Sequence, residues 1–152
     1  MKGLRDEGMN HFNHVFICFA AEDRYSIAEP IVYHLKNYGI KVWYDRYMLL
    51  MGDNRNLKNL VEGASKCNYA ITIISKYTAS SACAMEELAI IKHRSLQKGL
   101  VVFPVLYEIL PNELPTALLW VKDLIFKEAT VSSGTREICN HIACKITSDI
   151  CT

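Results

Sequence analysis

Short, almost continuously apolar runs recur along the chain, separated by longer stretches in which apolar and polar residues mix. Continuous runs, in contrast to strictly alternating ones, are typical of strands that are buried on both faces of a parallel sheet. Four clear runs and a weaker fifth are present: VFICFA (15–20), IKVWY (40–44), YAITIIS (69–75), LVVFPVLY (100–107) and DLIF (123–126). We therefore expect five strands.

Between these runs, apolar residues recur every three or four positions, which predicts amphipathic helices. The helical patterns are marked by Ile27–Tyr38, Leu57–Ala64, Ala84–Ile91 and Ile138–Ile146. Gly39 marks the end of the first helix, and Pro30 predicts that this helix either starts late or is kinked. Residues 111–120 contain two prolines, so a loop with a short helix is expected there.

Strands and helices that alternate five times predict a single flavodoxin-like α/β domain. In it, a doubly wound sheet of five parallel strands carries helices on both faces. Ligands of such folds bind beyond the carboxyl ends of the strands, where the strand order reverses. The loops 20–26, 45–55, 76–83 and 107–114 are therefore the candidate positions for a functional site.

The composition is that of one globular domain. The 152 residues include 17 basic and 16 acidic side chains, a formal net charge of +1 that gives no electrostatic reason to expect nucleic-acid binding. The polar, mixed-charge start of the chain does not read as a secretory signal, and no apolar run reaches the roughly 20 residues of a membrane span. We expect a cytoplasmic protein that does not contact a membrane.

Six cysteines lie at positions 18, 67, 83, 139, 144 and 151, and no two of them form a Cys-x-x-Cys pair. Buried free thiols are expected rather than disulfides. The histidines have no ligand-like spacing to these cysteines, so no metal site is expected.

Two further features point to function. The loop segment Tyr47–Met51 (YMLLM) places five large apolar or aromatic residues in a row between polar stretches, which predicts that they cover a pocket or contact another chain. The third helix opens after Ser81 and carries the adjacent acids Glu86 and Glu87. Acids near a helix N-terminus also suit its dipole. Because neighbouring helix residues point about 100° apart, only Glu87 borders the apolar stripe of Ala84, Leu88 and Ile91.

Four segments, in this order, resemble the Toll/interleukin-1 receptor (TIR) domain: VFICFAAEDR, GIKVWYDRYMLLMGD, ITIISKYTASSACAMEEL and VVFPVLYEILPNELP. The resemblance covers about residues 14–147. It implies an N-terminal extension (1–13), a TIR domain (14–148) and a tail (149–152). The family motif W-C-x-x-E-L places its acid at Glu87, with Cys83 where the family has Trp; aligning Cys83 with the family Cys would select Glu86 instead.

TIR domains comprise non-catalytic scaffolds and enzymes that cleave the nicotinamide–ribose bond of NAD+, and the resemblance is strongest to stand-alone bacterial enzymes. It implies Glu87 as the catalytic residue, NAD+ as substrate with no other cofactor, and immune signalling through a downstream effector that senses the product. The implied substrate-binding residues are Phe19, Ala20, Arg24, Trp43, Asp45, Leu49, Tyr77, Ser81 and Cys83. The segment Tyr47–Met51 is implied to contact a second TIR domain. A scaffold that acts by TIR–TIR assembly is the main alternative, and a nucleoside deoxyribosyltransferase-like enzyme is a weaker one.

Overall fold

The computed structural model of the chain describes residues 15–97 and 99–151. The predicted N-terminal extension, 1–13, lies outside these residues. A five-stranded parallel sheet has the order β2-β1-β3-β4-β5, formed by β1 (Val15–Cys18), β2 (Val42–Trp43), β3 (Tyr69–Ile74), β4 (Val101–Tyr107) and β5 (Lys127–Ala129). The predicted doubly wound fold is thereby confirmed, with the order reversing between β1 and β3.

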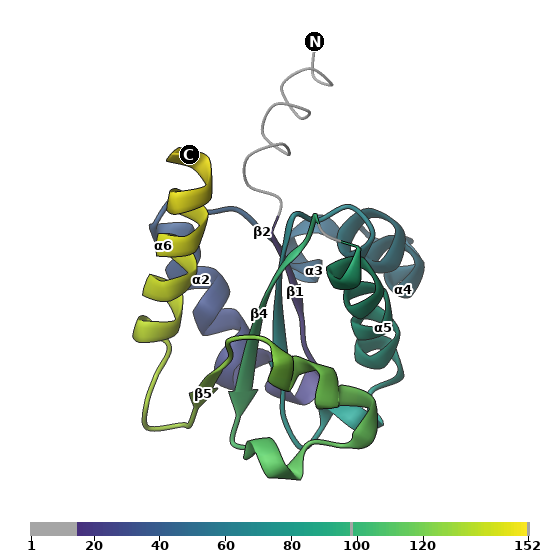
Figure 1. Cartoon of the computed structure of the whole chain (residues 1–152). Coiled ribbons are helices and arrows are strands. Elements are labelled where there is room, and N and C mark those ends of the chain that lie inside the picture. Colours follow the sequence, from purple (N-terminus) through teal and green to yellow (C-terminus); the bar gives the residue numbers. More distant parts are fainter. Residues whose placement is uncertain (1–14, 98, 152) are drawn as a thin grey trace.

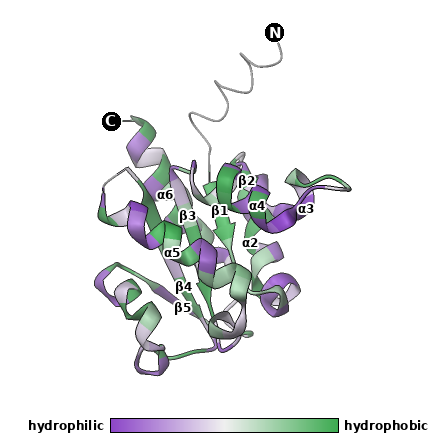
Figure 2. Cartoon of the chain, turned by 90° about the vertical axis from the view of Figure 1, so that its right-hand side faces the viewer, coloured by the Kyte–Doolittle hydropathy of each residue, from purple (hydrophilic) through white to green (hydrophobic). Residues whose placement is uncertain are grey.

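Helices cover both faces of the sheet (Figure 1). On one face lie α2 (Glu29–Asn37) and α6 (Arg136–Cys151), packed on β-strand residues that include Ile17, Ile71 and Ile73. On the other face lie α5 (Ala82–Leu96), the π-helical turns of η3 (Asn59–Ala64) and the 3₁₀ helix η6 (Thr116–Asp123). Figure 2 shows the apolar strands enclosed between more polar helices, as continuous apolar runs predict.

Short helical turns connect several of these longer elements. The 3₁₀ turn η1 (Ala21–Asp23) and the π turn η2 (Arg24–Ala28) precede α2, and α3 (Asp45–Met48) and α4 (Arg55–Lys58) precede η3. The 3₁₀ turns η4 (Thr78–Ser80) and η5 (Pro111–Glu113) follow β3 and β4. Pro30 occupies the first turn of α2, so the late start of this helix is confirmed. Gly39, with φ of +82°, follows its end as predicted.

Several boundaries differ from the sequence prediction. The fifth strand is Lys127–Ala129 rather than 123–126, because an edge strand that pairs through three residues needs no apolar run. The tail residues 149–151 continue α6. The segment Tyr47–Met51 is not wholly a loop, since Tyr47 and Met48 form the last half of α3.

The six cysteines are free thiols, as predicted. Cys18, Cys67 and Cys139 are buried, whereas the expected burial is wrong for Cys83, Cys144 and Cys151, which lie on exposed helix faces. Within residues 15–97 and 99–151, no group of His, Cys, Asp and Glu side chains is arranged to hold a metal ion. No helix in the same part of the chain combines the length and apolar character needed to span a bilayer.

Candidate active site

A cavity of about 120 Å³, referred to below as the Glu87 cavity, lies where β1, β2 and the segment after β3 meet. The strand order reverses beside it, between β1 and β3. Folds of this class bind ligands beyond the carboxyl ends of the strands at this point. Eleven residues line it: Phe16, Ile17, Phe19, Ala21, Trp43, Asp45, Arg55, Asn59, Ser81, Cys83 and Glu87. A larger apolar groove of about 470 Å³ between β4 and α6 is lined by no carboxylate.

Six of the predicted site residues line the Glu87 cavity: Phe19, Trp43, Asp45, Ser81, Cys83 and Glu87. Four do not. Ala20 is buried beside the cavity, Leu49 lies beyond α3, and Tyr77 is partly exposed after β3. Arg24, predicted to bind the substrate, does not line the cavity; it is buried, and its guanidinium pairs with Asp45.

Glu87 is 6% exposed and lies on the inner face of α5, together with Ala84, Leu88 and Ile91. Ser81 starts this helix, and its hydroxyl accepts a hydrogen bond of 3.2 Å from the backbone N–H of Ala84. Glu86, one residue earlier, is exposed and accepts a hydrogen bond of 3.0 Å from Asn56 Nδ2. The two acids therefore differ as the helix geometry predicts, and only Glu87 reaches the cavity.

Burial raises the pKa of Glu87 to about 7. The nearby carboxylate of Asp45 acts in the same direction, whereas the Cys18 and Asn59 side chains and the charge of Arg55 oppose the rise. A carboxyl group with a pKa near neutrality, enclosed in a cavity at the ligand edge of the sheet, is typical of a catalytic group.

Asp45 behaves in the opposite way. Burial acts to raise its pKa, but the hydrogen bonds and charge of Arg24 and the charge of Arg55 outweigh burial and hold the pKa below its ordinary value. Arg24 donates two hydrogen bonds of 2.8 Å to the two carboxylate oxygens, and Arg55 Nη2 lies 2.9 Å from Oδ2. Asp45 is therefore a fixed negative charge, while Glu87 titrates near neutral pH.

The guanidinium of Arg24 is held between two rings, 5.0 Å from the ring centre of Phe19 and 5.4 Å from that of Tyr44. It also donates a hydrogen bond of 2.8 Å to Tyr44 Oη, which in turn donates to Glu29 Oε2. Arg24 thus contacts the cavity indirectly, by fixing the carboxylate of Asp45, which lines it. Arg24 itself is not among the residues that line the cavity.

The sequence prediction missed Arg55 and Asn59. Asn59 Oδ1 accepts a hydrogen bond of 3.1 Å from Trp43 Nε1, and Asn59 lines the Glu87 cavity together with Glu87. Gly63, one turn later, allows this approach, since a Cβ there would lie 2.5 Å from Cε1 of Phe16 and 3.1 Å from Trp43 Nε1. In the sequence, the only indication was that polar residues interrupt the apolar pattern of 57–64.

The TIR domain profile matches residues 15–135. The chain belongs to the TIR domain family. Among solved structures, the TIR domain of the Toll-related receptor TRR-2 from Hydra magnipapillata superposes with a TM-score of 0.69 at 19% identity. That match covers 89% of this chain and 98% of the other. The TIR domains of the activated Roq1 resistosome give a TM-score of 0.64 at 18% identity, covering 88% and 99%. These likenesses establish the fold of this TIR domain.

Several curated relatives of this TIR domain are named for an enzymatic activity. The NAD(+) hydrolase TcpA of a Theionarchaea archaeon is 30% identical over 66% of this chain and 30% of its own length. The 2′ cyclic ADP-D-ribose synthase BtTIR of Bacteroides thetaiotaomicron is 32% identical over 65% and 34%. The NAD(+) hydrolase TcpC of Escherichia coli is 26% identical over 92% and 45%. This TIR domain spans less than half the length of each of these relatives.

Proposed function

We propose that this TIR domain cleaves the nicotinamide–ribose bond of NAD+, with Glu87 as the catalytic residue. The observation that carries the proposal is the buried carboxyl group of Glu87, which lines the Glu87 cavity and has a pKa of about 7. The names of the relatives as NAD(+) hydrolases and cyclic ADP-ribose synthases support the same chemistry. NAD+ is the substrate, and the proposed reaction uses no additional cofactor.

The chemistry requires few groups. Nicotinamide leaves a pyridinium as a neutral molecule, so no general acid is needed at the leaving group. The ribose develops oxocarbenium character in the transition state, as in glycoside hydrolysis. A carboxylate beside the ribose stabilises that positive charge or holds the ribose hydroxyls. Ionised Glu87 supplies this carboxylate, and Asp45 adds a second fixed negative charge at the same cavity.

The size of the cavity restricts which part of NAD+ enters it. At about 120 Å³, the cavity is smaller than the roughly 300–1,000 Å³ of sites that enclose a whole small ligand. We therefore place the nicotinamide riboside end inside, between the Trp43 ring and Glu87. The diphosphate then crosses the mouth near Arg55, which is 52% exposed and positively charged.

Incubation of concentrated protein with NAD+, followed by chromatography of the products, tests this function directly. Release of nicotinamide together with ADP-ribose, a cyclic isomer or a conjugate is the expected result. Intact NAD+ at all protein concentrations would instead favour the non-catalytic scaffold, which would use the exposed segment Tyr47–Met51 for assembly. An active enzyme fits the proposed role in immune signalling, in which a downstream effector senses the product.

The pH dependence of the reaction follows from the pKa of Glu87. Because the ionised form is the active one, kcat/KM is expected to rise through an acid limb near pH 7 and to be about tenfold lower at pH 6 than at pH 8. The positively charged pyridinium of bound NAD+ favours the carboxylate, so the limb in kcat should lie at lower pH. Steady-state rates between pH 5 and 9 measure both limbs. A kcat/KM that is flat from pH 6 to 8 would contradict the role of Glu87.

A further inference from the structure

The Glu87 cavity opens to solvent past three of the residues that line it. Ala21, Arg55 and Cys83 are exposed, whereas the other lining residues are buried or half-buried. These three residues therefore form the mouth of the cavity. Arg55 is the one charged residue among them, and it is the one cation among the described residues that line the cavity. Any part of a ligand that projects from the cavity must pass close to this guanidinium.

Asp45 fixes the position of the Arg55 guanidinium. Arg55 Nη2 lies 2.9 Å from Asp45 Oδ2, yet the Arg55 side chain remains 52% exposed. The buried Asp45 carboxylate does not depend on this contact for its charge balance, because Arg24 already donates hydrogen bonds of 2.8 Å to both of its oxygens. Two guanidinium groups thus share one carboxylate. Relative to that carboxylate, the positive charge of one guanidinium is in excess, and Arg55 holds it at the mouth.

This arrangement leaves Arg55 able to bind an anion. A guanidinium has five N–H donors, so its contact with Asp45 leaves donors for a second acceptor. The planar fork of these donors matches the oxygens of a phosphate group, and hydrogen bonds between two charged groups are stronger than neutral ones. A phosphate at the mouth could therefore bind Arg55 without displacing the contacts between Arg24 and Asp45.

The small cavity determines where a phosphate would lie. Because the cavity measures about 120 Å³, we have placed only the nicotinamide riboside end of NAD+ inside it. The substituent on the 5′ carbon of the ribose must then leave through the mouth, and in NAD+ that substituent begins with a phosphate group.

We propose that Arg55 is a specificity-determining residue that recognises the 5′-phosphate of the substrate. The enzyme should then cleave nicotinamide ribosides that carry this phosphate and discriminate against the unphosphorylated nucleoside. The specificity rests on the proposed NAD+-cleaving function. The anion site itself does not, and a binding measurement tests it separately.

The first test uses NAD+, nicotinamide mononucleotide and nicotinamide riboside, which share the same scissile bond, at pH 9, where Glu87 is ionised. Arg55→Gln should lower kcat/KM for the two phosphorylated substrates by about 10- to 100-fold, as expected for loss of a hydrogen bond to a charged group. The loss should lie mainly in KM. For nicotinamide riboside, kcat/KM should change by less than about twofold. Arg55→Lys keeps the charge and should recover part of the loss. An equal loss for all three substrates would show that Arg55 only supports Asp45, and it would overturn the proposal.

Arg46→Gln is the matched control. Arg46 is also an exposed arginine and follows Asp45 in the chain, but its guanidinium lies 5.2 Å from the ring centre of Tyr25, and it does not line the cavity. This variant should keep the wild-type kcat/KM for all three substrates. If Arg46→Gln and Arg55→Gln lost the same activity on the phosphorylated substrates, the effect would be one of general surface charge, and the proposal would fail.

The second test needs no turnover. Calorimetric titration with ADP-ribose, which keeps the ribose 5′-diphosphate but lacks nicotinamide, should show at least about tenfold weaker binding to Arg55→Gln than to wild type. The difference should shrink between about 50 mM and about 500 mM sodium chloride, because salt screens the charge of an exposed guanidinium. No binding to wild type, or equal binding to both proteins, would overturn the anion site.

The two tests separate this inference from the proposed function. Weakened ADP-ribose binding to Arg55→Gln, in a protein that leaves NAD+ intact, would support the anion site and refute the function. Cleavage of NAD+ by Arg55→Gln with the wild-type substrate preference would leave the function standing and overturn the role of Arg55.

Discussion

Replacement of Glu87 by glutamine is expected to lower NAD+ cleavage by about a thousandfold and, at the same time, to make the protein more stable at pH 8. Loss of activity follows because the neutral amide cannot stabilise the positive charge on the ribose, and a single electrostatic group of this kind contributes roughly 10²–10³ in rate. The gain in stability follows because a buried carboxylate is costly, whereas a glutamine of the same shape carries no charge.

The pKa of Glu87 sets the sign and the pH range of the stability effect. In the folded protein this pKa is about 7, against an ordinary value of 4.5, so the folded state binds more protons than the unfolded state between these two pH values. The stability of the wild type therefore falls as pH rises from 4.5 to 7. Above pH 7 the full cost applies, at most about 3 kcal/mol, and below pH 4.5 it disappears.

Thermal unfolding of wild type and Glu87→Gln at pH 4.5 and pH 8 measures this effect. The Tm values should coincide at pH 4.5, whereas at pH 8 the variant should melt several degrees higher, since each kcal/mol corresponds to about 2–4 °C in a domain of this size. A lower Tm for Glu87→Gln than for wild type at pH 8, with equal Tm values at pH 4.5, would show that the folded protein stabilises the carboxylate. That outcome would contradict a raised pKa and the catalytic role proposed for Glu87.

Glu86→Gln is the matched control, since Glu86 precedes Glu87 on the same helix but is exposed and bonded to Asn56. Its NAD+ cleavage is expected to stay within about twofold of wild type, with an unchanged Tm at both pH values, because exposed surface substitutions have small effects. Equal losses of activity from Glu86→Gln and Glu87→Gln would argue against the assignment of Glu87.

The sequence predicted most of this fold because its central strands are buried on both faces. Runs such as 69–75 and 100–107 must be apolar throughout in a parallel sheet, and they coincide with β3 and β4. The edge strand β5 escaped prediction because Lys127 is only partly buried and Glu128 is exposed, so no apolar run marks it. The segment 123–126 instead begins at the last residue of η6 and ends just before the strand.

Site residues whose position follows from local helix geometry could be predicted from the sequence. Those whose position depends on a partner far along the chain could not. Glu87 could be distinguished from Glu86 because helix periodicity alone decides which acid faces inward. Arg24, by contrast, was predicted to bind the substrate, since nothing local shows that Asp45, 21 positions later, forms a bidentate pair with it. Asn59 and Arg55 were missed for the same reason, because polar residues in a short helix ordinarily face solvent.

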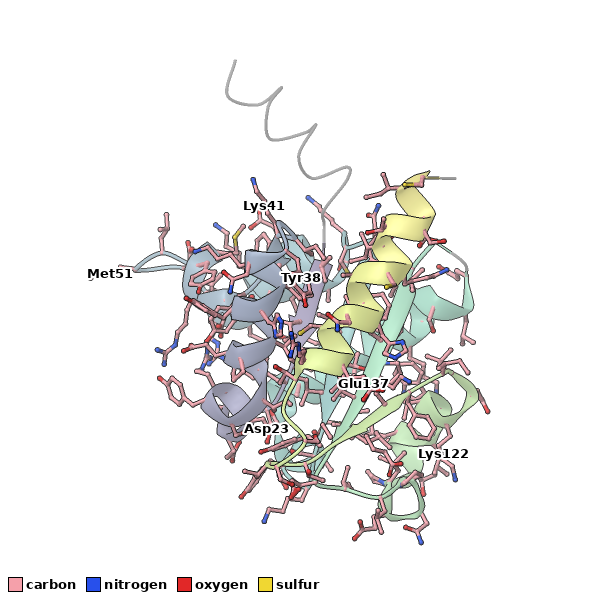
Figure 3. All side chains as sticks on the ribbon, turned by 90° about the vertical axis from the view of Figure 1, so that its left-hand side faces the viewer. Asp23, Tyr38, Lys41, Met51, Lys122 and Glu137 are labelled. Atoms are coloured by element: carbon pink, nitrogen blue, oxygen red, sulfur yellow. The ribbon has the colours of Figure 1, made fainter. Side chains whose placement is uncertain are left out.

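Substitution of Leu50 by aspartate is expected to suppress self-association and NAD+ cleavage together, without unfolding the domain. Leu50 is 74% exposed, and Tyr47, Met48 and Met51 beside it are also exposed. Figure 3 shows Met51 at the tip of a segment that projects away from the rest of the domain. A monomer gains nothing from this exposure, and we propose that these side chains contact a second TIR domain.

The segment is also connected to the site. Asp45, which lines the Glu87 cavity, begins α3, and Tyr47 and Met48 end it. A contact at Tyr47–Met51 would therefore act on α3, the helix that begins at Asp45. Burial of two or three such side chains is worth about 1.5–3 kcal/mol each before the cost of association, so net self-association should be weak. Specific activity should consequently rise with protein concentration.

Light scattering and NAD+ cleavage across a concentration series measure both effects for wild type and Leu50→Asp. An aspartate at the contact would be buried without a partner, which is costly, so the variant should stay monomeric and weakly active at concentrations where the wild type assembles. Val131→Asp is the matched control, because Val131 is 78% exposed in the turn after β5, far along the chain from α3. A wild-type monomer whose specific activity does not vary with concentration, and which Leu50→Asp leaves unchanged, would show that the segment Tyr47–Met51 covers the site within one chain and recruits no second one.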